Sequence, residues 1–439
     1  MTDDVTSRER LLIRGVGRWS LLGLLINLTL GAGVLGLPSK AFAQIGVHSF
    51  VALGVAAAAV ALIALCFAEL GSRFTATGGP YLYVREAFGD TLGFAAGWLA
   101  WVTRPLSVAT LLNLLIVYVA GFLPAAATEP WRSLIIVVLV AALTGVVLSG
   151  VRQSAWLSNV LAVVKFALLA GVAVLGLLYL GGGALPQAAP VAPKAFMETL
   201  LLLVFAFIGF ESVSVVAGEV KDPRRSYPFA ILLGVGLIAT LYAALLLGCV
   251  VLLPDLASSD RPVADLARAA AGDWAYVAVL AGAPLVLLGS IGVTCMLSPR
   301  LLFALAERGQ APSPLAAIHP RFRTPHWSVL LSGAVILLTT LFNDFLTALT
   351  FTTLTRVLLY VGGCAALLRL RATQAEPAPF RVPGGPVIPL VCIAASLAVV
   401  ILGGWTSLPQ LALIILAGYV LLGLTRLGQG LSRRRAGQS

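Results

Sequence analysis

Charged residues are scarce in this chain of 439 residues: 29 lysines and arginines and 18 aspartates and glutamates make up 11% of it. Water-soluble domains carry a charge on about a quarter of their residues. Hydrophobic residues account for 59%, and the mean hydropathy is +1.00. A soluble enzyme or a nucleic-acid-binding protein of this length would have too little polar surface to stay dissolved. The composition therefore indicates a protein that crosses a membrane many times.

Residues that build metal centres and active sites are also few. The three histidines, His48, His319 and His326, are scattered over predicted loops and helix ends. The five cysteines lie inside apolar runs at irregular spacing: Cys66, Cys249, Cys295, Cys364 and Cys392. We interpret them as small core residues that form neither a disulfide framework nor a metal site. Because a Walker-type nucleotide-binding motif is also missing, the sequence predicts no enzyme activity, no ATP-driven pumping, no metal and no cofactor.

Long apolar runs, by contrast, occupy most of the chain. A membrane-spanning helix needs about 20 mostly apolar residues, and that length gives twelve predicted spans. Their approximate ranges are 20–44, 47–70, 90–122, 131–149, 154–180, 197–218, 229–253, 274–306, 326–343, 344–370, 387–404 and 407–427. An even number of spans places both termini on one side. If that side is the cytoplasm, twenty of the 29 basic residues fall in inside segments and five in outside segments, which is the positive-inside pattern.

Two of the predicted spans carry glycine-rich interruptions. Residues 27–38 read NLTLGAGVLGLP, and residues 205–211 read FAFIGFE. A glycine in a helix interior costs about 1 kcal/mol relative to alanine, so these stretches weaken the helix. Close helix packing is the alternative interpretation of such small residues.

The interrupted spans are the first and the sixth, so they open two consecutive sets of five spans. Interrupted segments at matching positions of two halves are typical of inverted-repeat transporters. We expect a substrate site where the two breaks face each other. Free N–H groups there would receive an anion and free carbonyls a cation, which matches the two charges of an amino acid.

Five stretches of the sequence resemble the amino acid–polyamine–organocation (APC) superfamily of amino acid permeases. They are GAGVLGLP, FAELGSRFTATGGPYLYVREAFG, FAFIGFESVSVVAGEVKDPRRSYPFAI, SPRLLFALAERGQAPSPLAAIHPRFRTP and PFRVPGGPVIPL. The resemblance covers nearly the whole chain in order. It implies an all-α integral membrane protein with a LeuT-type 5+5 inverted repeat and 12 transmembrane helices, of which helices 1 and 6 are broken at mid-membrane.

The same resemblance implies a division of the chain. Residues 1–19 would be a cytoplasmic tail, 20–370 a ten-helix transport core, 371–386 a cytoplasmic loop, 387–427 two accessory transmembrane helices and 428–439 a basic cytoplasmic tail. Charged residues at the cytoplasmic helix ends, among them Glu69 and Arg73, would serve topology or an inner gate.

The resemblance also implies how a substrate is held. Its carboxylate would meet the backbone N–H groups of Ala32, Gly33 and Val34, and its amino group would meet carbonyls near Thr29, Phe205 and Ile208. Phe205 stands where the family places an aromatic gate, although packing is the ordinary role of a phenylalanine in a span. The complete set of predicted substrate-binding residues is Thr29, Gly31, Ala32, Gly33, Val34, Arg104, Phe205, Ala206, Ile208 and Gly209.

Lys165 and Glu211 are the predicted proton-coupling residues. Lys165 lies in the middle of the fifth span, where a charge costs several kcal/mol unless it is paired or neutralised. The resemblance implies a fifth-span lysine that reaches towards the first and eighth spans and couples transport to protons; a purely structural ammonium is the alternative. Glu211 follows the second break, where it is expected to accept hydrogen bonds from unwound backbone, with proton sensing as a second role.

Arg104 interrupts the third span beside a proline. A guanidinium group keeps its charge, so this one needs an anion or water. We favour a structural ion pair with Glu211, Asp90 or Glu86 over a contact with the carboxylate of an acidic substrate. Arg356, in the tenth span, poses the same question.

The sequence thus favours a secondary active transporter that works by alternating access on neutral, hydrophobic L-amino acids and is coupled to protons. An amino acid exchanger, or an acidic amino acid transporter that uses Arg104, is the alternative. A channel is disfavoured because no span repeats a ring of like charges or a filter-like loop. The expected partners are an amino acid, protons and the lipid bilayer of a bacterial inner membrane, with both termini cytoplasmic and no nucleic acid. The oligomeric state is left open.

Overall fold

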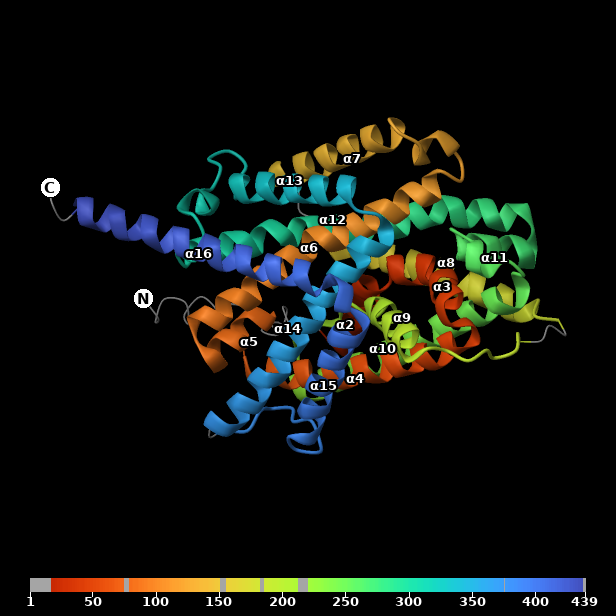
Figure 1. Cartoon of the computed structure of the whole chain (residues 1–439), viewed down its shortest axis with the longest axis horizontal. Coiled ribbons are helices and arrows are strands. Elements are labelled where there is room, and N and C mark those ends of the chain that lie inside the picture. Colours follow the sequence, from red (N-terminus) through yellow and green to blue (C-terminus); the bar gives the residue numbers. More distant parts are fainter. Residues whose placement is uncertain are drawn as a thin grey trace.

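The computed structural model describes residues 17–74, 79–150, 155–181, 185–211, 220–374 and 376–436, and the regular elements in these ranges are helices (Figure 1). Eight helical segments of this part of the chain are long and apolar enough to cross a membrane. Two shorter apolar helices, His326–Phe342 and Val387–Gly403, accompany them. This is the composition of an integral membrane protein.

The described ranges contain fifteen α-helices. In chain order they are α2 (Arg18–Thr29), α3 (Ala32–Ile45), α4 (Ser49–Arg73), α5 (Gly79–Phe88), α6 (Asp90–Val119), α7 (Trp131–Leu148), α8 (Ala155–Leu178), α9 (Pro193–Phe205), α10 (Pro223–Leu252), α11 (Pro262–Ala271), α12 (Asp273–Glu307), α13 (His326–Phe342), α14 (Phe345–Thr373), α15 (Val387–Ala398) and α16 (Leu408–Ala436). A π-helical turn, Val399–Gly403, continues α15.

Four of the twelve predicted spans are interrupted or short. The first is divided into α2 and α3, and the sixth contains α9, while its residues 212–218 lie outside the described ranges. The other two are α13, with 17 residues, and α15, with 12. Helices α10 and α16 are longer than predicted, because a criterion based on apolar runs stops at arginines that continue the helix towards water.

The interrupted helices lie inside the bundle. Helix α2 packs against α8 and α10, and α3 packs against α9. On the other side of this group, α6 runs along both α12 and α14. Helices α7 and α13 pair at the periphery, and α16 extends away from the bundle towards the C-terminus (Figure 1). The weakest points of the helical backbone are therefore surrounded by continuous helices.

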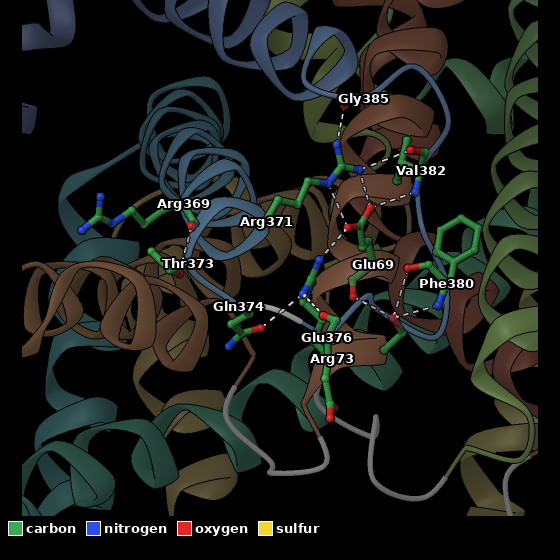
Figure 2. Close-up of polar contacts among 11 residues, drawn as sticks. Glu69, Arg73, Arg369, Arg371, Thr373, Gln374, Glu376, Phe380, Val382 and Gly385 are labelled. Carbon is green, nitrogen blue, oxygen red and sulfur yellow. Dashed lines mark hydrogen bonds and ion pairs between the residues drawn. The ribbon is translucent and has the colours of Figure 1, made fainter.

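A buried carboxylate joins three segments of the fold. Glu69 of α4 is 0% exposed, and its oxygens accept hydrogen bonds from Arg371 at 2.9 and 2.5 Å, from Arg73 at 3.2 Å and from the N–H of Val382 at 2.8 Å (Figure 2). Arg371 also donates to the carbonyl of Gly385. These donors offset the cost of removing the charge from water. They hold α4, α14 and the segment in front of α15 together.

Removing this carboxylate should destabilise the protein strongly. Glu69→Ala leaves two guanidinium groups without their anion, and we expect it to lower the free energy of unfolding by about 3–5 kcal/mol, as when one partner of a buried ion pair is lost. Thermal unfolding of the purified protein in detergent measures the effect. Asp90→Ala is the matched control, because the pair of Asp90 with Arg85, at 2.7 Å, is exposed and is worth at most about 1 kcal/mol. Equal effects of the two substitutions would contradict the interpretation.

Candidate functional site

The two helix interruptions touch each other. Helix α2 ends at Thr29 and α3 begins at Ala32, while the chain beyond the end of α9 runs through turns. A Cβ atom on Gly33 would lie 2.5 Å from the Cα of Ala206. Gly209 has a φ of +129°, and a Cβ atom there would lie 2.6 Å from the carbonyl oxygen of Leu28. Only glycine permits this approach of backbone to backbone.

Opposite ends of helix dipoles meet at this contact. The first N–H groups of α3 have no partner within the helix, and Gly31 in front of it offers no side-chain cap. They form the positive end of a helix. The carbonyl ends of α2 and α9, which are negative, lie against it. An ordinary turn bond, from the N–H of Ile208 to the carbonyl of Phe205 at 3.0 Å, closes α9. The arrangement offers donors to an anion and acceptors to a cation.

A cavity of about 70 Å³ opens beside the contact. Most of the predicted site residues line it, namely Thr29, Gly31, Ala32, Gly33, Arg104, Phe205, Ile208, Gly209 and Glu211. Val34 and Ala206 do not, since both face a narrow space against Tyr242 of α10, whose hydroxyl donates to the carbonyl of Ala206 at 2.9 Å. The structure therefore places these two residues behind the cavity wall.

Sequence reasoning missed the opposite wall, which α6 and α12 provide. Its members are Ser107, Leu111, Gly289, Ser290, Val293, Thr294 and Leu297, and Asn27 and Leu28 join them from α2. A signal for part of this wall was present in the sequence. Ser290 and Thr294 are one helical turn apart in a predicted span, so they share a face, and two hydroxyl groups on one face of an apolar helix indicate a polar lining.

Glu211 is the acceptor at the second break. Its carboxylate accepts the backbone N–H of Gly209 at 3.2 Å and the hydroxyl of Tyr360 at 3.1 Å. It also forms an ion pair with Arg356 of α14. The hydrogen bond from unwound backbone is the one expected from the sequence. The ion pair explains how both charges can lie in the bundle, because each compensates the other.

Arg104 does not form the expected ion pair. Its favoured partner, Glu211, is paired with Arg356, and Asp90 is paired with Arg85. Within the described ranges no carboxylate lies at ion-pair distance from Arg104, and its Nε atom is buried without a hydrogen-bond partner. The prediction failed because the sequence does not fix the rotation of a helix that is buried on most sides. The guanidinium group lines the cavity instead.

Lys165 lies one layer behind the cavity wall and is 1% exposed. Its Nζ donates to the hydroxyl of Ser290 at 2.8 Å and to the carbonyl of Asn27 at 3.4 Å. The ammonium group therefore connects α8 with the end of α2 and with α12, as the resemblance implied. In the part of the chain that is described, no carboxylate lies within ion-pair distance of it. Both of its hydrogen-bond acceptors are neutral oxygens.

The cavity wall contains another buried polar atom that has no hydrogen-bond partner. The hydroxyl oxygen of Thr29 is buried, borders the cavity and has no hydrogen-bond partner. An unsatisfied buried polar group costs about 1–3 kcal/mol. Together with Arg104 and the N–H groups of α3, it gives the cavity a set of hydrogen-bonding groups that a polar ligand can satisfy.

Comparison with known proteins gives consistent results. A family model described as amino acid permease matches residues 16–418. An uncharacterized transporter of Mycobacterium tuberculosis is 31% identical over 79% of this chain and 78% of its own length. The branched-chain amino acid permease BcaP of Bacillus subtilis is 26% identical over 95% and 94% of the two chains. The methylthioribose transporter of the same organism is 26% identical over 88% and 87%. The last two relatives are named for different substrates.

A methyl group at the contact between the breaks should be poorly tolerated. Gly33→Ala places a Cβ atom against the backbone of Ala206, and overpacking of this kind costs about 1–3 kcal/mol. Gly23→Ala is the control: Gly23 lies in α2 with no atom within 4 Å of its Cβ position, and we expect up to about 1 kcal/mol of stabilisation from helix propensity. Thermal unfolding compares the two variants. A Gly33→Ala protein as stable as the wild type would show that the interruptions do not touch.

Proposed function

The chain belongs to the amino acid permease family, and we propose that it is a secondary active transporter that carries an amino acid across the membrane by alternating access. The observation that supports the proposal is the contact between two interrupted helices beside a cavity. Broken helices are tolerated inside a membrane where they border a binding site. A chain that only needed to span the bilayer would gain nothing from them.

We also propose the architecture that the resemblance implies. The ten predicted spans from α2 to α14 would form two inverted sets of five, broken at α2–α3 and after α9, and α15 and α16 would be accessory spans. The excess of basic residues in alternate connections supports cytoplasmic termini. In a bacterium the membrane would be the inner one.

The proposed binding mode follows from the helix ends. The carboxylate of the substrate accepts hydrogen bonds from the first N–H groups of α3, those of Ala32 and Gly33 in the cavity wall and that of Val34 directly behind it. Its amino group lies among the carbonyls near Thr29, Phe205 and Ile208. The ring of Phe205 covers the bound molecule, and its motion opens the site to one side. Backbone groups then bind both charges of the substrate, so its side chain contacts the other walls of the cavity.

Neutral, hydrophobic side chains are the first candidates. Leu111, Val293, Leu297 and Ile208 give the cavity apolar surface. A cationic side chain is disfavoured, since the wall contains two guanidinium groups, of Arg104 and Arg356, and the Glu211 carboxylate is already engaged. The relative named as a branched-chain amino acid permease agrees with this choice.

Acidic amino acids are the second candidates, and a specific observation favours them. The guanidinium group of Arg104 borders the cavity without a carboxylate partner among the described residues. A second carboxylate on the substrate would supply that partner. The apolar area of the wall and the small volume of the cavity, about 70 Å³, keep this candidate second.

Uptake into proteoliposomes tests the function and the substrate class together. We expect a neutral amino acid to accumulate when the outside is acidic, both in the wild type and in Arg104→Gln. If glutamate is the substrate instead, Arg104→Gln lowers its uptake by about 10- to 100-fold, the value of a charge-assisted hydrogen bond. Arg268→Gln, at an exposed arginine of α11, is the control. If no neutral, acidic or cationic amino acid is taken up, the proposed transport function is wrong.

We propose that Lys165 couples this transport to protons. The charged Nζ holds Ser290 and the end of α2 by charge-assisted hydrogen bonds, and loss of the proton weakens both bonds, so rearrangement of the break is linked to the proton. Uptake should therefore rise as the outside becomes more acidic in the wild type. In Lys165→Ala it should be slower and independent of pH. Identical pH profiles would leave Lys165 a structural role only, and uptake that requires amino acid inside the vesicle would identify an exchanger.

The control for this measurement is Lys40→Ala. Lys40 lies near the end of α3 and pairs with Asp260 at 3.3 Å on the surface. Its removal deletes the same charge without touching the helix breaks. It should leave the pH profile unchanged.

A further inference from the structure

Three of the five cysteines form a buried cluster. The sulfur atoms of Cys66, Cys364 and Cys392 all lie within 4.8 Å of one another. They come from three helices, α4, α14 and α15, and the residues are between 0 and 3% exposed. All five cysteines are buried and free, as expected of small core residues, but nothing in the sequence indicated that three of them lie together. Their irregular spacing along the chain concealed the grouping.

The cluster has the size of a thiolate metal site. Metal–sulfur bonds in proteins are about 2.3 Å long, so three sulfur atoms around one ion stand about 4 Å apart. Thiols already within 4.8 Å of one another reach that spacing by small rotations of their side chains. We propose that Cys66, Cys364 and Cys392 bind a soft, thiophilic metal ion of the monovalent copper class.

The donor set favours this class over hard or borderline ions. Thiolates select soft ions such as Cu(I), whereas calcium and magnesium require oxygen ligands. Structural zinc sites use four ligands, and within the described residues no histidine or carboxylate joins the three thiols. The nearby carboxylate of Glu69, one helical turn from Cys66, is already bound by Arg73, Arg371 and the N–H of Val382.

The metal ligand is the thiolate form of cysteine, so each of the three thiols that binds the ion gives up its proton to water. Cys392 also borders an apolar cavity of about 390 Å³ between α4, α9 and α15.

An ion at this place would fix three helices to one another. Helix α14 also carries Arg356, two helical turns before Cys364, in the wall of the candidate substrate cavity beside the helix breaks. If the proposed transport function is correct, a bound soft ion holds α14 against α4 and slows the cycle. This consequence rests on the transport function, whereas the binding itself does not.

Binding of Cu(I) to the purified full-length protein tests the proposal. The ion is supplied from a coloured chelator that competes for it, and the loss of colour gives stoichiometry and affinity. We expect one tightly bound ion per chain and a higher unfolding temperature. Cys66→Ala, Cys364→Ala and Cys392→Ala should each weaken binding by about 100-fold or more, since even partners outside the first ligand shell are worth 10- to 100-fold.

Cys249→Ala and Cys295→Ala are the matched controls, because both cysteines are buried and lie outside the cluster. They should bind the ion like the wild type. Unfolding of each variant without metal verifies that it is folded, and Cys392→Ser provides a second variant of similar size. Equal affinity in the cluster and control variants, or no stoichiometric binding to a folded wild type, would overturn the proposal whether or not the protein transports amino acids.

Discussion

A peptide backbone cannot leave its N–H and C=O groups unsatisfied inside a membrane, and the centre of this structure is organised by that constraint. The interruptions after α2 and α9 free such groups, and each interruption is buried against the other. Gly33 and Gly209 allow the close approach, Glu211 accepts an N–H group, and Lys165 donates to a carbonyl. The backbone N–H and C=O groups that these contacts do not satisfy face the cavity. The feature that makes this place costly to fold is also the one on which the proposed binding of a molecule with two opposite charges depends.

Positively charged side chains outnumber negatively charged ones around the helix breaks. Two guanidinium groups and one carboxylate line the cavity, and an ammonium group stands behind it. The carboxylate of Glu211 joins the second break to α14 through Arg356 and Tyr360. In the proposed function, the carboxylate of a bound amino acid would meet this positive environment and compete for one of these bonds, which would link ligand binding to the position of α14.

Much of this could be predicted from the sequence, and the failures have a common cause. Apolar runs located the helices, and the glycines near residue 31 located the first break, because hydropathy and backbone propensity are local properties. The partner of Arg104 could not be found in this way. A helix buried on most sides, such as α6, has no polar face that reports its rotation. The pairing of Glu211 with Arg356 and the meeting of Cys66, Cys364 and Cys392 depend on such rotations.

The carboxylate of Glu69 has a consequence for how the chain can be divided. Its donors lie on α4, at the end of α14 and in the segment before α15, so a buried hydrogen bond joins the ten-helix core to the segment that leads into the two accessory helices. A chain shortened after α14 would keep the carboxylate of Glu69 and lose the N–H group of Val382 that donates to it. In modular terms, the segment that leads into α15 belongs to the same folding unit as α4 and α14, and exchanging this segment between relatives would require its partners Glu69 and Arg371 to be exchanged with it.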